Sequence, residues 1–260
     1  MVGRVGYAAK GIVYFVVGIL AGMAALGEGG GTTGQKGAIN EIGQQPFGQV
    51  LLVLLGIGLG CFAIWRFLAG AFDAEGKGSD AKGLAIRAGS LVSALIHCSL
   101  SLASFRAVMG NGGGDGGGDA RSLTARMLEM PLGPWLVILA GVAVGVVGLV
   151  QWGRAIQGKY RSKFTLEGRA AGQRHWIERI SKAGLFARGL VFLLIAFFLA
   201  QAGWQADAGE VRGFGGALKS LAHQPYGPWL LGITALGVIC YGIYCAVVAL
   251  YGSLGSDRRE

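Results

Sequence analysis

A proline corner, Gln224-Pro225-Tyr226-Gly227-Pro228-Trp229, opens the last apolar run of the chain. Two similar corners occur earlier, Gln45-Pro46-Phe47-Gly48 before the run to Trp65 and Met130-Pro131-Leu132-Gly133-Pro134-Trp135 before the run to Trp152. Proline cannot continue a preceding helix, but it is well tolerated in the first turn of the next one. Each corner is therefore expected to lie where a short helix ends and a long apolar helix begins.

The composition is typical of a membrane protein and unlike that of a soluble domain. Of the 260 residues, 53% are hydrophobic and only 14% are charged, and the mean hydropathy is +0.54. Crossing the hydrocarbon core as a helix takes about 20 residues. Six apolar runs are long enough, at about 7–26, 47–72, 84–109, 132–156, 185–204 and 226–254. The sequence thus predicts an all-α bundle of six transmembrane helices.

The chain repeats a two-helix unit three times. The start Arg4-Val5-Gly6-Tyr7-Ala8-Ala9-Lys10-Gly11 corresponds to Lys182-Ala183-Gly184-Leu185-Phe186-Ala187-Arg188-Gly189, and a weaker middle copy begins at Arg87-Ala88-Gly89. Two spans per unit return the chain to the side it left, so all units share one orientation. This predicts a pseudo-threefold bundle with a short interfacial helix before each proline corner. The expected boundaries are 1–72 for unit 1, 84–156 for unit 2, 157–178 for a basic cytoplasmic linker and 179–254 for unit 3.

Basic residues lie mainly on one side of this predicted bundle. The termini and the loops between units carry 17 of the 23 Lys and Arg residues, whereas the acidic residues divide evenly between the two sides. By the positive-inside rule, both termini are expected in the cytoplasm.

These features together resemble a known family. The Gly-Tyr-Ala-Ala-Lys-Gly start at residues 6–11, the corners and the Trp65-Arg66 ending resemble the bacterial membrane proteins catalogued as domain of unknown function 1206. The resemblance covers nearly the whole chain as three copies and is weakest in unit 2. There Ser93 stands where the other units have Lys10 and Arg188, and Met130 replaces the glutamine before the proline. The resemblance implies a six-span protein of the bacterial plasma (inner) membrane, with no assigned activity and no assigned catalytic residues.

The third predicted span carries a polar face. Its members are spaced by three or four residues and so share one side of a helix: Ser90, Ser93, His97, Ser101 and Ser104. Such a face should contact protein or water rather than lipid. We favour a seam of hydrogen bonds between helices. A pathway for a small polar solute or protons, and a metal or haem site at His97, are the alternatives.

Other residues of the spans are expected to support packing and anchoring. Glycines four residues apart predict close helix contacts: Gly18 with Gly22, Gly56 with Gly60, and Gly141 with Gly145. Four cations are expected near span ends, with their charges extended to the membrane interface: Lys10, Arg66, Arg106 and Arg188.

The basic linker suits a membrane surface. Its basic residues alternate with aromatic ones, which fits anionic lipid headgroups at the cytoplasmic face, although setting the topology would also explain the charges. The candidate lipid contacts are Lys159, Arg161, Lys163 and Arg174. We expect the lipid bilayer and a membrane-protein partner, and no nucleic acid.

No catalytic pattern stands out. The sequence has no HExxH or GxSxG motif, no Asp or Glu within the six runs, and no CxxC pair among its four cysteines. We therefore expect no enzyme activity and no cofactor, and a non-catalytic accessory subunit or scaffold in a membrane complex. The alternatives are a small-solute channel or transporter that uses the polar face of the third span, and a membrane redox or metal-binding protein centred on His97.

Overall fold

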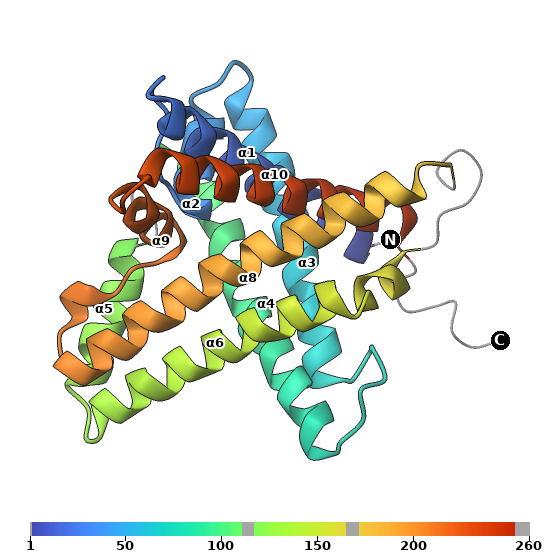
Figure 1. Ribbon diagram of the computed structural model, residues 1–260. Coiled ribbons are helices and arrows are strands. Elements are labelled where there is room, and N and C mark those ends of the chain that lie inside the picture. The colour runs from blue at the N-terminus through green and yellow to red at the C-terminus, as the bar shows by residue number, and fades with distance from the viewer. Residues whose placement is uncertain (1, 111–116, 165–171, 253–260) are drawn as a thin grey trace.

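The computed structural model describes residues 2–110, 117–164 and 172–252, and their regular secondary structure is helical (Figure 1). Six helices are long and apolar enough to cross a membrane: α1 (Val2–Leu26), α3 (Gly48–Ala71), α4 (Ala81–Val108), α6 (Gly133–Ile156), α8 (Arg174–Gln205) and α10 (Gly227–Tyr251). The prediction of an all-α protein with six membrane-spanning helices is confirmed. Because α8 begins at Arg174, the last residues of the expected linker form its first turn.

A short helix precedes each proline corner, as predicted. These helices are α2 (Gln35–Gly43), α5 (Gly117–Leu128) and α9 (Phe214–Ala222). Two short 3₁₀ turns, η1 (Lys159–Lys163) and η2 (Ala208–Glu210), flank α8 in the chain.

The three corners share one backbone geometry. In each corner the glycine N–H donates to the carbonyl oxygen three residues earlier, at 2.8 Å, which closes a turn with proline in its second position. The residue between proline and glycine is left-handed, with φ of 60° at Phe47, 63° at Leu132 and 60° at Tyr226. A Cβ on the glycine would collide with a backbone carbonyl oxygen, as at Gly48, Gly133 and Gly227. The corner therefore requires glycine as well as proline.

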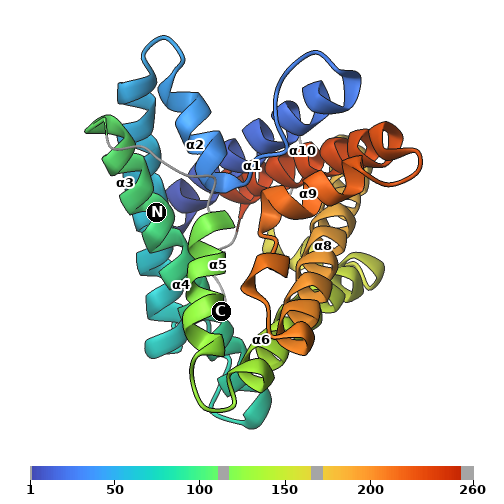
Figure 2. The same ribbon diagram turned by 90° about the vertical axis from the view of Figure 1, so that its left-hand side faces the viewer.

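The spans pack as three pairs, and each pair joins two different units. The second span of each unit lies along the first span of the next, giving α3 with α4, α6 with α8, and α10 with α1 (Figures 1 and 2). This cyclic pattern is what a pseudo-threefold repeat requires. The helices α2, α5 and α9 gather between the three pairs (Figure 2).

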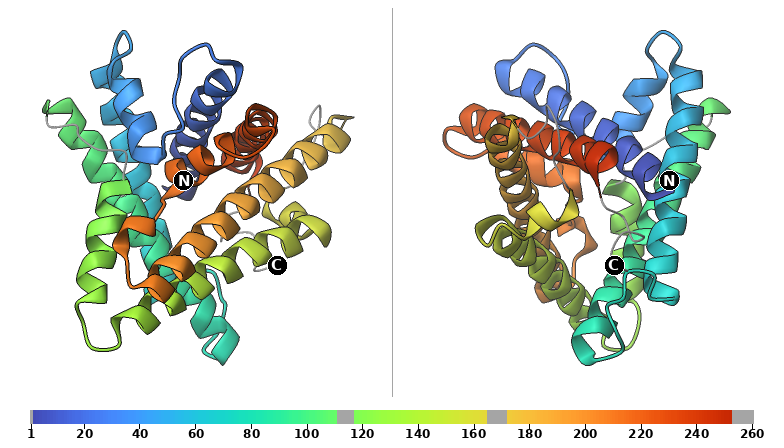
Figure 3. Two further views of the ribbon diagram at one scale, coloured as in Figure 1. Left: turned by 60° about the vertical axis from the view of Figure 1, so that its left-hand side comes forward. Right: turned by 90° about the vertical axis from the view of Figure 1, so that its right-hand side faces the viewer.

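The chain closes into a ring at its two ends. The Arg4 guanidinium at the start of α1 donates to the Gly252 carbonyl oxygen after α10, at 3.1 and 3.3 Å. Within units, α1 packs on α3 and α8 packs on α10, whereas among the described residues α4 and α6 make at most marginal contact (Figure 3). The ring is therefore tightest around α1 and α10 and loosest in unit 2.

The glycines named from the sequence face the partner helix of each pair. A Cβ on Gly18 would lie 2.6 Å from Ile239 of α10, and one on Gly56 would lie 3.0 Å from the Phe105 ring of α4. The same holds across the other close approaches: Gly22 to Ala235, Gly60 to Ser101, and Gly141 and Gly145 to Ala196. Small residues thus let the backbones of paired helices approach, which is how membrane helices without a hydrophobic drive achieve dense packing.

Candidate functional site

The polar face of α4 lies against α3. Ser90, His97, Ser101 and Ser104 are buried, and Ser93 is partly exposed. The Ser101 hydroxyl donates across the helix pair to the Gly56 carbonyl oxygen at 2.7 Å. Ser90 and Ser104 each donate to a carbonyl oxygen four residues earlier in α4, at 3.0 Å. These hydroxyls are thus bonded within the protein.

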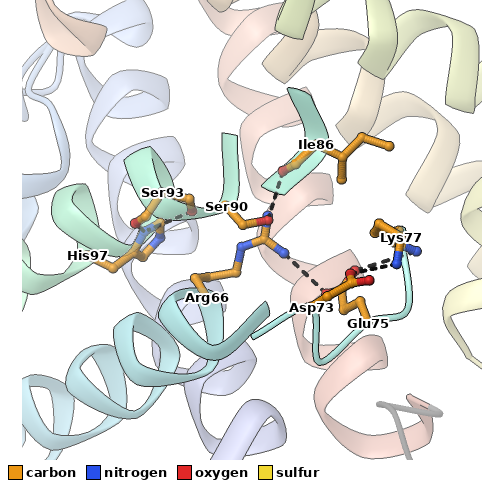
Figure 4. A network of polar contacts seen from close by, with 8 residues as sticks. All are labelled: Arg66, Asp73, Glu75, Lys77, Ile86, Ser90, Ser93 and His97. Carbon is orange, nitrogen blue, oxygen red and sulfur yellow. Dashed lines mark hydrogen bonds and ion pairs between the residues drawn. The ribbon is translucent and has the colours of Figure 1, made fainter. Parts of the chain in front are cut away.

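His97 is held by Ser93 of its own helix (Figure 4) and by a ring of α3. Its Nδ1 lies 2.7 Å from the Ser93 carbonyl oxygen, so this nitrogen carries the proton and donates it. The imidazole packs against the Phe62 ring, with the ring centroids 4.4 Å apart. Within the described chain, no three His, Cys, Asp or Glu side chains are grouped so that they could hold a metal ion.

The charged residues at the end of α3 form a separate structural network (Figure 4). Arg66 pairs with Glu75 at 3.2 Å, and Lys77 lies 3.7 Å from the same carboxylate. Asp73 accepts the backbone N–H groups of Lys77 and Gly78, which lowers the pKa of its carboxyl below the usual value. The Arg87 guanidinium donates to the last carbonyl oxygens of α3. This network fastens the α3–α4 loop.

Two further cations lie where helices pack together, and of these Lys10 is buried and Arg188 is partly exposed. Lys10 is the ninth residue of the 25-residue α1 and is 7% exposed, and Arg188 is the fifteenth residue of the 32-residue α8. Lys10 is therefore packed against protein and does not extend freely along its helix, whereas the position of either cation relative to the membrane interface stays a prediction. Aromatic rings contact both cations, and apart from Phe192 on the helix of Arg188 itself these rings come from other helices, so the sequence of either cation's own helix reveals few of them.

Lys10 and Arg188 share contacts with the same group of aromatic rings. The Lys10 ammonium lies over the rings of Phe62 on α3, at 4.8 Å, and Tyr241 on α10, at 5.8 Å. The Arg188 guanidinium lies 4.8 Å from the same Tyr241 ring. It also lies 4.4 Å from Phe192 and 5.7 Å from Tyr14, and its Nε donates to the Tyr14 hydroxyl at 3.3 Å. We call this set the cation–aromatic cluster, comprising Lys10, Tyr14, Phe62, Arg188, Phe192 and Tyr241.

The cluster follows the internal repeat. In the first span of every unit, a polar residue is followed four residues later by a ring: Lys10 and Tyr14, Ser93 and His97, Arg188 and Phe192. In the second spans, Phe62 of unit 1 and Tyr241 of unit 3 follow the proline of their corner by the same number of residues. The residue at the equivalent position of unit 2 is Val147. Because His97 packs on Phe62, unit 2 reaches the edge of the cluster. All three units therefore converge on one region, which matching the repeats by position could have indicated.

The cluster carries positive charge without a carboxylate. Neither Lys10 nor Arg188 forms an ion pair among the described residues, and the ionisable side chains that act most strongly on Lys10 are Arg188, Cys245 and Arg66. Burying an ion costs several kcal/mol of free energy, whereas a cation–π contact stabilises it by about 0.5–2 kcal/mol. Lys10 has two such contacts and no hydrogen bond within the described chain. The ring contacts alone therefore do not offset its burial, and the region is suited to attract an anion.

The candidate lipid contacts lie apart from this cluster. Arg161 and Arg174 both pair with Glu178, at 2.7 and 3.0 Å, and the Tyr160 hydroxyl donates to the Glu178 carbonyl oxygen. Lys159 begins η1, whereas the side chain of Lys163 and residues 165–171 lie outside the described structure. Glu178 thus neutralises part of the positive charge of the linker.

Comparison with known proteins agrees with the repeat. A family model described as Domain of Unknown Function (DUF1206) matches three tandem segments, residues 5–73, 88–158 and 183–252. "Uncharacterized protein YxxB" of Bacillus subtilis (strain 168) is 35% identical over 249 residues, which cover 96% of this chain and 90% of that protein. No solved structure matches the chain. With its three tandem matches and this full-length relative, the chain belongs to the DUF1206 family.

Proposed function

We propose that this protein holds a small polar solute inside the bilayer, at the cation–aromatic cluster, and that it does so without catalysing a reaction. The proposal includes a bacterial plasma (inner) membrane location with both termini in the cytoplasm. The excess of Lys and Arg on the side of the termini supports this orientation. A reporter fused after Glu260 is expected to be active only in its cytoplasmic form, and an active extracytoplasmic reporter would reverse the orientation.

One observation carries the solute proposal. Lys10 and Arg188 both lie close to the Tyr241 ring, at 5.8 and 4.8 Å, and no carboxylate of the described residues pairs with either. Ionisable residues inside membrane segments are costly, and where they occur they commonly mark the pathway or site of a solute. A cluster built only for packing would be more stable with apolar side chains in both positions.

The proposed solute site is not the polar face of α4, where the sequence indicates a possible pathway. The hydroxyls of Ser90, Ser101 and Ser104 already bond to backbone carbonyls, and His97 Nδ1 bonds to Ser93. That face therefore fits a seam between α4 and α3. Its contribution to the site is to position Phe62 through His97.

A non-catalytic accessory subunit or scaffold is the second candidate. The α4 seam favours it, because the buried hydroxyls of Ser101 and Ser104 already have hydrogen-bond partners within the protein. Under either candidate we propose that the basic linker contacts anionic lipids at the cytoplasmic face. Arg161 and Arg174 stay exposed there in spite of their pairing with Glu178.

A panel of small solutes separates the two candidates. The full-length protein is incubated with uncharged, zwitterionic, cationic and anionic solutes, and its unfolding temperature in detergent and solute permeation in proteoliposomes are measured. The variant Lys10→Met with Arg188→Met removes both charges. Arg106→Met removes an exposed cation in the last turn of α4 as the matched control.

The solute proposal expects at least one solute to stabilise or permeate wild type and the Arg106→Met control but not the double variant. Identical responses of all three proteins to every solute would contradict it. In that case, co-purification of other membrane proteins after gentle extraction would test the scaffold.

A further inference from the structure

We infer that the solute is an oxyanion, bound through a carboxylate or phosphate group between the Lys10 ammonium and the Arg188 guanidinium. This inference rests on the proposed function, because it names the chemical class of ligand for the same cluster. Hydrogen-bond donors without an acceptor among the described residues lie around the Tyr241 ring.

Lys10 supplies the first unused donors. The residue is 7% exposed, and within the described chain none of its three N–H groups meets an acceptor. The rings of Phe62 and Tyr241 attract the charge but take no directed hydrogen bond from it. An anion beside the ammonium would supply both the missing charge and the missing acceptor.

Arg188 supplies a forked set of donors near the same Tyr241 ring. Its Nε is used by the Tyr14 hydroxyl, and its terminal N–H groups have no acceptor among the described residues. A guanidinium presents paired N–H groups that match the two oxygens of a carboxylate or phosphate. This geometry favours an oxyanion over a spherical halide.

The Tyr14 hydroxyl supplies a third kind of donor. Its oxygen accepts from Arg188 Nε at 3.3 Å and from Gln35 Nε2 of α2 at 3.1 Å. A hydroxyl has two acceptor positions and one O–H, so both acceptor positions are filled and the proton is left to donate. No described residue takes that proton. The hydroxyl therefore adds a neutral donor beside Arg188.

Other ligand classes fit the cluster less well. A cation would be repelled by two like charges that no carboxylate of the described residues pairs with. A neutral solute could accept hydrogen bonds but would leave both charges uncompensated. The oxyanion could be a free solute or a lipid headgroup, since both offer the same chemistry.

Direct binding tests the inference. Radiolabelled acetate and inorganic phosphate are dialysed to equilibrium against the detergent-purified full-length protein, at constant ionic strength set with sodium chloride. We expect saturable binding to wild type and to Arg106→Met. Lys10→Met and Arg188→Met should each weaken it about tenfold or more, and Tyr14→Phe by a smaller factor, because a neutral donor contributes less than a charged one.

Two further measurements make the result interpretable. Short-chain phosphatidic acid replaces phosphate in a parallel series, and binding of that lipid alone, lost in the same variants, assigns the oxyanion to a headgroup. Unfolding temperatures without ligand report folding. Lys10→Met should unfold at the same or a higher temperature than wild type, because it removes an unpaired buried charge.

Several results would overturn the inference. Equal binding of acetate and phosphate to wild type and to the cluster variants would place the anions elsewhere, and binding of chloride alone would exclude an oxyanion. A drop in unfolding temperature in Lys10→Met, together with no oxyanion binding to wild type, would make the cations structural. If a neutral or cationic solute binds in a cluster-dependent way, this inference fails but the proposed function stands. If no solute does, both fail.

Discussion

Equivalent residues of the three units make different contacts inside the bundle. Lys10 and Arg188 both meet Tyr241, but Arg188 also donates to Tyr14, whereas Lys10 relies on rings alone. In unit 2 a serine replaces the cation, and its carbonyl oxygen holds His97. Two copies of the repeat thus contribute charge, and the third contributes a neutral ring that supports Phe62. Loss of sequence similarity in unit 2 therefore coincides with a change of role.

The burial of Lys10 could not be predicted from its own helix. A single lysine nine residues into an apolar helix fits a side chain extended to the interface, and the 3.6-residue period shows only which neighbours share its face. Phe62 and Tyr241, which cover the ammonium, are distant in sequence. The polar face of α4 was easier to predict, because all five of its members lie on one helix.

A single hydroxyl tests whether the α4 face acts as a seam. Ser101→Ala removes the hydrogen bond to the Gly56 carbonyl oxygen on α3 and should lower the free energy of unfolding by about 1 kcal/mol. Ser99→Ala is the matched control, because the exposed Ser99 bonds only to the Ile96 carbonyl oxygen of its own helix. The control should stay within about 0.5 kcal/mol of wild type. Denaturant titration in mixed micelles measures both, and equal losses would exclude a special role for Ser101.

At the scale of helices and turns, the corner shows why one short motif recurs. Proline ends the short helix, glycine allows the close carbonyl approach, and the residue between them accepts a left-handed backbone. That conformation costs a bulky residue about 1 kcal/mol. Even so, Phe47, Leu132 and Tyr226 occupy it with their side chains 84%, 73% and 81% exposed. Large apolar and aromatic side chains held outward at helix ends suit the region between lipid tails and water.

The position of each corner could be predicted from the sequence, but its glycine requirement could not. Proline and the start of an apolar run are local signals, so the ends of the helices could be predicted from the sequence alone. The need for glycine depends on where a carbonyl oxygen of the preceding short helix points. At Gly227 that oxygen belongs to Ala222, the last residue of α9.

Replacing a corner glycine tests this requirement. Gly227→Ala forces its Cβ against the Ala222 carbonyl oxygen and should lower the free energy of unfolding by about 2 kcal/mol or more. Gly232→Ala in the same helix is the control, because its Cβ would meet only the Ala25 Cβ, at an ordinary 3.7 Å. The control should be neutral or slightly stabilising, since alanine favours helix. If the two variants unfold alike, the corner tolerates a side chain.

For the whole molecule, the order of helices around the ring is the feature that sequence reasoning left open. Hydrophobic runs identify the spans, and the repeat predicts a threefold arrangement, but every span is apolar on several faces. Lipid provides no hydrophobic drive that would select one partner face over another. Pairs of glycines indicate which face of a helix packs closely, but they do not indicate which other helix it packs against. The pairing of each second span with the next unit, and of α10 with α1, therefore required the structure.

Disulfide crosslinking tests whether the ring closes between the first and last helices. A Cβ on Gly22 would lie 4.0 Å from Ala235 Cβ, and one on Gly145 would lie 3.4 Å from Ala196 Cβ, distances near those that a disulfide spans. In a protein with its four cysteines changed to serine and a protease site in the linker, Gly22→Cys with Ala235→Cys should link the two fragments on oxidation. Gly145→Cys with Ala196→Cys should do the same for α6 and α8. The exchanged pairs, Gly22→Cys with Ala196→Cys and Gly145→Cys with Ala235→Cys, use the same four positions and should remain separable on a denaturing gel. Efficient linkage of the exchanged pairs, or none between α1 and α10, would mean that the three units do not close on one another, and the cation–aromatic cluster would lose the helix contacts that assemble it.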